Sequence, residues 1–229
     1  MKAAIAEIKS KGYWQMIIRP VTYKPDRIKD KLAIVDALDS INVSLRGWSY
    51  PHIDRQQAPI IEQTLVGQIT HWTYFYECWM MIMSGQFFHV AGMRHDQGAT
   101  VQTSPFTEIP AGTKVLGVGD TLFRMTEIVL FGTRFANMFA KGEGVDLELE
   151  VGGLEARHLV VDDPGRAGFD RYVSRSRTPF KRTIRLSEDA STEEVLATAR
   201  KLAAELFELF GCRLADQVLA EWQSQIRRW

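Results

Sequence analysis

The stretches GYWQMIIRP (residues 12–20) and NVSLRGW (residues 42–48) flank a helical pattern and decide the predicted fold. Each reads as a strand that stops at an arginine, followed by Pro20 in the first case and Gly47 in the second. The intervening apolar residues recur at helical spacing, with positions Ile28, Leu32, Val35 and Leu38. A strand, a helix and a strand of this combined length form a βαβ unit, whose strands are parallel. The sequence therefore predicts a parallel strand pair near the N-terminus.

Working outward from this unit, a short helix is predicted before residue 12 and a strand up to about residue 69. Residues 75–83 are apolar and aromatic, which predicts a buried helix that stops at Gly85, before another strand over residues 86–92. After a long loop, residues 119–141 have a wide apolar arc and predict a largely buried helix with Asp120 as its N-cap.

The second half of the chain adds a hairpin, a basic strand and helices. Residues 145–161 alternate apolar and polar side chains around Gly152-Gly153, which predicts a two-residue hairpin turn. A basic extended segment follows over residues 171–186, and Ser191-x-x-Glu194 predicts a capping box for a helix that ends at Gly211. The last helix is predicted to present Leu214, Val218, Trp222 and Ile226 on its apolar face.

The predicted fold class is α+β, with a mixed sheet that contains the N-terminal βαβ unit, the hairpin with its basic strand, and C-terminal helices. A single domain over residues 1–229 is expected, and the alternative is that residues 190–229 form a helical appendage.

Composition limits the class of protein. Hydrophobic residues make up 45% and charged residues 24% of the chain, which is typical of a globular protein rather than a disordered one. Basic and acidic residues balance at 28 each, so no overall positive field favours nucleic acid. Cys78 and Cys212 form no motif, which predicts buried thiols in a reducing compartment. No apolar run is long enough to span a bilayer, and we expect a cytoplasmic protein with no membrane segment.

A ligand site is predicted where the two N-terminal strands end. Parallel strands would bring Arg19 and Arg46 to one sheet edge, where two guanidinium groups suit phosphate or carboxylate. Trp48 and Tyr50 could stack on a base, and His52 could form a hydrogen bond or transfer a proton. The alternative is that the arginines pair with nearby acids and the aromatic rings cover the edge of the core. These acids are Asp36, Asp39 and Asp54.

A nucleic-acid interface is a second prediction. Residues 165–185 carry seven basic side chains and one acid, Asp170. A strand would give these side chains a stripe that follows a phosphate backbone. The predicted contacts are Arg171, Arg175, Arg177, Lys181 and Arg185. The alternative is cross-strand pairing with the acids of the predicted hairpin, which are Asp146, Glu148, Glu150 and Glu155.

Signals for catalysis and metal binding are weaker. Histidines and acids gather over residues 71–96 without the spacing of a known metal motif. Asp146 and Glu150 resemble the carboxylates of restriction-type nucleases, but Arg157 stands where such enzymes have a lysine. The charged residues of the helix over 119–141, from Asp120 to Lys141, are expected to form one stripe that is either solvated or ion-paired. The sequence predicts no catalytic residue, metal or cofactor.

Several stretches together resemble a group of uncharacterised bacterial proteins that are associated with Schlafen/AlbA-like domains. The shared pattern is I-R-P, then R-G-W-x-Y-P-H, S-G-Q-F-x-H and T-E-I. The resemblance implies a common set of residues, namely Arg19, Arg46, Trp48, Pro51, His52, Gly85, His89 and Glu127. It also implies nucleotide or nucleic-acid binding and a place in bacterial stress or phage defence. The Schlafen/AlbA-like part is not found in these 229 residues, so a function that resides there is not expected here.

Three functional hypotheses remain open. The first is a binding or sensing module for an anionic ligand, a nucleotide or a nucleic acid, which acts with a protein partner or as a homodimer. The second is a small nuclease or nucleotide-processing enzyme that uses the histidines and carboxylates. The third is a structural interaction protein whose C-terminal helices form the contact surface.

Overall fold

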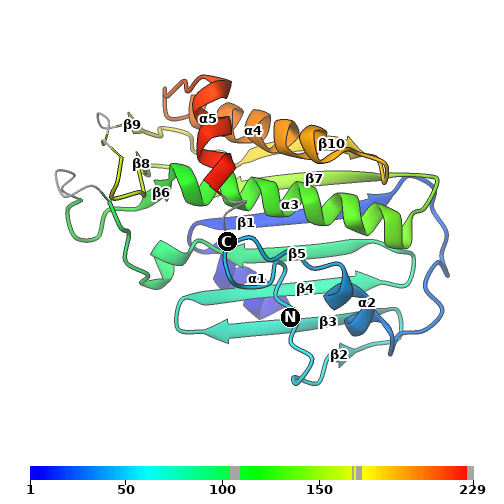
Figure 1. Ribbon diagram of the computed structural model, residues 1–229. Helices are drawn as coiled ribbons and strands as arrows, with labels where there is room; N and C mark the ends of the chain where they lie inside the picture. Colours follow the sequence, from blue (N-terminus) through cyan, green and yellow to red (C-terminus); the bar gives the residue numbers. More distant parts are fainter. Residues whose placement is uncertain (104–108, 167, 169–171, 226–229) are drawn as a thin grey trace.

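A large antiparallel sheet forms the centre of the molecule (Figure 1). The computed structural model describes residues 1–103, 109–166, 168 and 172–225. Seven strands lie in the order β10-β7-β1-β5-β4-β3-β2, and a smaller sheet has the order β6-β8-β9. The strands of the large sheet are β1 (Tyr13–Pro20), β2 (Ile60–Ile61), β3 (Leu65–Trp72), β4 (Phe75–Ile82), β5 (Phe87–Gly92), β7 (Val145–Gly152) and β10 (Phe180–Leu186). The small sheet contains β6 (Val115–Gly117), β8 (His158–Val160) and β9 (Tyr172–Val173).

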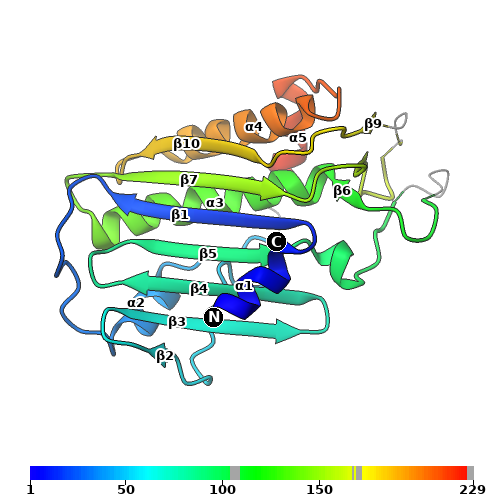
Figure 2. The same ribbon diagram turned by 180° about the vertical axis from the view of Figure 1, so that it is seen from behind.

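Helices cover the two faces of the large sheet unequally. Figure 1 shows α2 (Ile34–Ser40), α3 (Val118–Phe139), α4 (Thr192–Glu208) and α5 (Asp216–Ser224) in front of the sheet. Figure 2 shows that α1 (Lys2–Lys9) lies alone on the other face. The main core lies between the sheet and the front helices, and a smaller cluster with Ile8, Tyr13 and Cys78 lies beneath α1. The α+β class predicted from the sequence is therefore confirmed.

The predicted βαβ unit is absent. β1 pairs with β5 and β7, and both pairings are antiparallel. Residues 42–48 form no strand; Val43 makes only an isolated bridge with Tyr50. The predicted helix is reduced to α2, and Leu32 is 76% exposed instead of lying on an apolar face. The run of strand-favouring residues in 42–48 is too short to determine strand pairing. Tertiary contacts determine it instead, and they leave this stretch outside the sheet.

The predicted helix over residues 75–83 is strand β4. This strand is buried on both faces because Trp79 and Met81 join the main core, whereas Tyr76 and Cys78 pack under α1. A strand buried on both faces has no alternation of apolar and polar residues, so its sequence resembles that of a buried helix. The neighbouring strand predictions, now β3 and β5, are confirmed. Both cysteines are free and buried, as predicted.

The predicted hairpin over residues 145–161 is wrong in its second half. β7 forms as expected, but it pairs with β1 and β10, while β8 leaves to join β6 in the small sheet. Gly153 has a φ of +71°, and a Cβ there would lie 2.7 Å from the Cα of Gly12. Only glycine fits both constraints, so the pair of glycines marks a close backbone approach instead of a hairpin turn.

The first turn of α3 is capped by a residue from another segment. Asp120 is not the N-cap, which is Gly117. The carboxylate of Asp162 accepts hydrogen bonds from the backbone N–H groups of Gly119 and Asp120 at 2.7 and 2.8 Å. Burial, and next the negative charge of Asp120, raise the pKa of Asp162. The long-range cap thereby joins the residues after β8 to α3, which contributes more residues to the main core than any other described helix.

The C-terminal helices follow the sequence prediction more closely. Ser191 and Glu194 form both hydrogen bonds of a capping box at the start of α4. In α5, Trp222 is buried as predicted, whereas Val218 is exposed and Leu219 takes its place in the core. Ile226, the last member of the predicted face, lies outside the described residues. Because α4 and α5 both contribute to the main core, residues after 190 share that core with the N-terminal strands.

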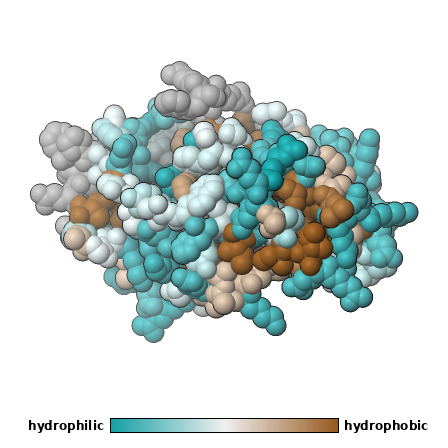
Figure 3. Space-filling model, turned by 90° about the horizontal axis from the view of Figure 1, so that it is seen from below, coloured by the Kyte–Doolittle hydropathy of each residue, from teal (hydrophilic) through white to brown (hydrophobic). Residues whose placement is uncertain are grey.

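The β2 edge of the sheet is apolar at the surface. Exposed side chains on or beside it include Leu32, Ile60, Ile61 and Ile82. Figure 3, which views the molecule from below, shows apolar atoms gathered towards one end of this surface.

We predict that the Asp162 cap contributes measurably to stability. Replacing Asp162 with Ala should lower the free energy of unfolding by about 1 kcal/mol, because two N–H groups of α3 lose their acceptor. Asp162→Asn should cost less, since the amide keeps one acceptor oxygen and removes the repulsion with Asp120. Urea denaturation of the two variants measures the difference. Equal losses in both variants would contradict a capping role.

Candidate ligand-binding pocket

A short closed loop positions the first residues of the site. Val43 and Tyr50 exchange two backbone hydrogen bonds of 2.9 and 2.7 Å, and Gly47 between them has a φ of +82°. This closure places Arg46 against α3 and Trp48 against Phe75 of β4. The aromatic and basic residues of this stretch therefore belong to a loop that is anchored to a helix, and they do not end a parallel strand.

Arg46 anchors the loop to α3. Its Nε and Nη2 donate to the two carboxylate oxygens of Glu127 at 2.9 and 2.6 Å, and Nη1 donates to Asp120. Arg124 lies 3.3 Å from the same carboxylate of Glu127, which is fully buried. Burial opposes the charge on Arg46, but Glu127 and Asp120 outweigh it and raise the pKa of Arg46. The charged stripe predicted on this helix is therefore ion-paired at its N-terminal half, and its charges there are largely buried instead of solvated.

A buried polar chain crosses from the loop to the sheet. Tyr50 Oη lies 3.4 Å from Nδ1 of His89, and His89 Nε2 lies 3.0 Å from Oε2 of Glu77. The backbone N–H of His52 donates to the other oxygen of Glu77 at 3.1 Å. Burial raises the pKa of Glu77, but His89, Arg124 and His52 lower it by more, so this carboxylate is ionised at neutral pH.

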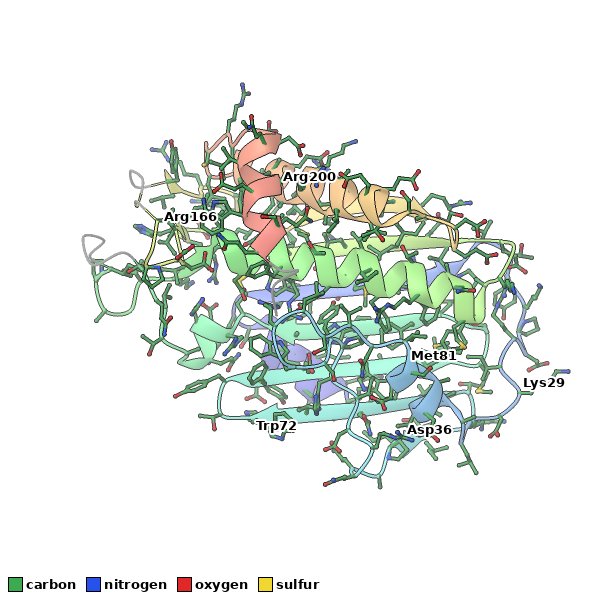
Figure 4. All side chains as sticks on the ribbon, viewed as in Figure 1. Lys29, Asp36, Trp72, Met81, Arg166 and Arg200 are labelled. Atoms are coloured by element: carbon green, nitrogen blue, oxygen red, sulfur yellow. The ribbon has the colours of Figure 1, made fainter. Side chains whose placement is uncertain are left out.

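A cavity of about 130 Å³ lies between the loop, α3 and the strands β3 and β4. Its lining residues are Trp48, Ser49, His52, Thr70, Trp72, Phe75, Glu77 and Arg124. The rings meet edge to face, with centroids 5.7 Å apart for Trp48 and Phe75 and 4.4 Å apart for His52 and Trp72. Trp72, which is labelled in Figure 4 on β3, is 53% exposed and leaves this side of the cavity open to solvent.

Unpartnered polar atoms gather around this cavity. Trp48 Nε1, His52 Nε2 and Arg124 Nε are buried and have no hydrogen-bond partner within the described part of the chain. Arg94 Nε shares this property, and its guanidinium lies 4.6 Å from the ring of Trp48 and 4.7 Å from that of Phe75. Four of the seven such atoms found in the described residues are therefore at one place. Leaving buried donors unpaired is costly, which is typical of a site that a ligand completes.

The structure brings together four of the five predicted ligand-binding residues. One loop region contains Arg46, Trp48, Tyr50 and His52. Tyr50 is nevertheless a core residue, and the guanidinium of Arg46 is paired with Glu127 of α3. Arg19 is not part of the site. It pairs with Glu148 on the α1 side of the sheet, so the predicted convergence of Arg19 and Arg46 is wrong. The cause is the antiparallel pairing of β1, which removes the common strand edge.

Sequence reasoning missed most of the opposite wall. Thr70, Trp72 and Phe75 come from β3 and β4. Arg94, from the 3₁₀ turn η1 (Arg94–Gln97), stacks against the rings of Trp48 and Phe75 beside the cavity. The dense aromatic run at residues 72–76 is the available signal, but the predicted strand ends at about residue 69 and therefore stops short of Thr70 and Trp72. The alternation of side chains along β3 places these two residues on one face of the strand.

The basic segment is largely engaged in surface ion pairs. Lys181 and Arg185 face Glu150 and Asp146 in register across β10 and β7, at 2.9 and 2.6 Å. Arg177 lies 2.9 Å from Glu155, and Arg175 is exposed. Arg171 and Asp170 lie outside the described residues. The cross-strand pairing considered as the alternative is thus present at two of the predicted positions.

No candidate metal centre emerges from the described residues, because none of their histidines, cysteines and acids form a group of three that could hold an ion. Arg157, which replaces the nuclease lysine, is buried and pairs with Asp96 through two hydrogen bonds of 2.9 and 2.6 Å. This pair joins η1 to the start of β8.

Comparison of the chain with protein-family models, curated proteins and solved structures finds no match. The resemblance to the bacterial group therefore stays a prediction. Across the described segments, no helix has the length and apolar character needed to cross a membrane.

We predict that Arg46→Ala destabilises the protein by about 3–5 kcal/mol, because a fully buried carboxylate loses its bidentate partner. Arg55→Ala is the matched control, since Arg55 pairs with Asp36 at the surface and should contribute less than about 1 kcal/mol. Denaturant unfolding at neutral pH compares the two. Similar losses in both variants would contradict the anchoring role of Arg46.

The same network predicts an acid-sensitive fold. Burial raises the pKa of Asp120, but Arg46 and Arg124 lower it by more, and the pKa of Glu77 is lowered as described above. A carboxyl whose pKa is lower in the folded state stabilises the fold fully above its unfolded pKa of about 4 and loses this effect as the pH falls further. Unfolding free energies measured from pH 6 downwards should decline less steeply in Asp120→Asn than in the unmodified protein. Parallel curves would contradict the assignment.

Proposed function

We propose that this protein is a ligand-binding module whose pocket takes an anionic small molecule of the nucleotide class. The single observation that carries the proposal is the presence of buried donors from Trp48 and Arg124, without partners among the described residues, on one aromatic-walled cavity, with Arg94 stacked against two of its lining rings. The nitrogens concerned donate hydrogen bonds and cannot accept them, so the missing partner has to be an acceptor.

Charge supports an anionic ligand. The carboxylates of Asp120 and Glu127 are taken by Arg46 and shared with Arg124, whereas Arg94 has no carboxylate partner among the described residues. Burial lowers the pKa of Arg94, with smaller opposing effects from nearby acids. A phosphate beside this guanidinium would relieve that cost, and the planar fork suits phosphate geometry.

The aromatic walls support a planar group in addition to the charge. Indole and phenyl rings from Trp48, Trp72 and Phe75 offer faces and edges on which a base can stack. A catalytic role is less well supported, because the lowered pKa of Glu77 makes this carboxylate a weak proton acceptor near neutral pH.

Calorimetric titration with the common nucleoside monophosphates and with inorganic pyrophosphate tests this function. We expect at least one nucleotide to bind, and Arg94→Gln and His52→Gln to weaken that binding by about tenfold or more, as loss of a charge-assisted or buried hydrogen bond requires. Arg55→Gln and His71→Gln are matched controls, since both side chains are exposed and neither lines the cavity. Absence of binding by every compound, or equal binding by all four variants, would contradict the proposal.

A further inference from the structure

Glu77 is an unexpected member of a pocket rich in donors. One of its oxygens accepts from the backbone of His52 and the other contacts His89, and each carboxylate oxygen can accept a further hydrogen bond. A bare anion such as phosphate would meet this ionised carboxylate and be repelled. The group that enters the cavity therefore has to bring a donor for Glu77 together with acceptors for its neighbours.

Donor side chains share the cavity with Glu77. Arg124 and His52 both lower the pKa of Glu77, and all three side chains line the cavity. Trp48 adds an indole N–H that has no partner within the described residues. The lining thus offers one ionised acceptor, Glu77, together with several donors. Its complement is a ligand edge with one N–H between two carbonyl oxygens.

Size restricts the ligand further. The cavity of about 130 Å³ is smaller than a typical small-molecule pocket of roughly 300–1,000 Å³. It is close to the roughly 150 Å³ of an engineered cavity that accepts one benzene ring. A single six-membered ring fits this space, whereas a two-ring purine exceeds it. The sugar and phosphate of a nucleotide would remain outside, beside Arg94.

We propose that the pocket binds a six-membered ring with an imide edge, as in a uracil or thymine nucleotide, through Glu77 and its flanking donors. The ring N–H donates to Glu77, and the two adjacent carbonyls accept from Arg124 and from Trp48 or His52. This inference rests on the proposed nucleotide-class function and adds the identity of the base. Glu77 becomes the residue that selects the base.

Titration of the full chain with uridine 5′-monophosphate, its N3-methyl derivative and guanosine 5′-monophosphate tests the inference. We expect uridine 5′-monophosphate to bind, and both other compounds to bind at least tenfold more weakly. Methylation removes the donated proton without changing the phosphate, and the purine is too large. Glu77→Gln should also weaken uridine 5′-monophosphate binding by about tenfold, since the charge-assisted bond is lost. His71→Gln is the control and should bind normally.

The outcomes separate the two proposals. Equal binding of the methylated and unmethylated nucleotides, or of guanosine and uridine nucleotides, would overturn the imide inference. If Arg94→Gln still weakened nucleotide binding in that case, the nucleotide-class function would stand. No binding of any nucleotide would overturn both. If Glu77→Gln does not fold, because His89 loses its charged partner, the comparison of methylated with unmethylated nucleotide on the unmodified protein decides the question.

Discussion

The contact of Arg46 with Glu127 and Asp120 is the interaction on which the pocket depends. Helix α3 buries Arg124 and Glu127 and partly buries Asp120, and buried charges are tolerated only when they are paired. Arg46 supplies the missing cation from a segment more than seventy positions earlier in the chain. By doing so it fixes the loop closed by Val43 and Tyr50. Trp48 and His52 are then held opposite β3 and β4, and the space between them is the cavity.

The same pairing explains why donors remain available there. Glu127 has only two oxygens, and Arg46 uses both, so Arg124 shares the carboxylate through one nitrogen, and its Nε has no partner among the described residues. Arg94 stacks on Trp48 and Phe75 and pairs with no acid in the described part of the chain. The positive groups are thus held in place before any ligand arrives, which lowers the entropic cost of binding. Glu77, fixed by His89, adds the single acceptor.

Sequence patterns predicted the class of fold but not its connections. The capping box of α4, the long helix α3 and strands β1, β3, β5 and β7 follow from local periodicity and end signals. β4 was mistaken for a helix because a strand buried on both faces shows no alternation, and the partners of β1 and β7 depend on contacts distant in the chain. In the site, aromatic and basic residues of one loop could be recognised together. Arg94, Trp72 and Arg124 could not, because only the antiparallel sheet and the Arg46 contact bring them to that loop.

The most direct test of the central claim is a nuclear magnetic resonance titration that follows the indole N–H signals of the tryptophans while uridine 5′-monophosphate is added to the ¹⁵N-labelled protein. Trp48 Nε1 should move the most, because its indole lines the cavity that the base enters, while Trp14, buried in the core, should stay unchanged. Shifts confined to tryptophans away from the cavity, such as Trp222, or no shift at saturating nucleotide, would contradict the assignment of this pocket as the ligand site.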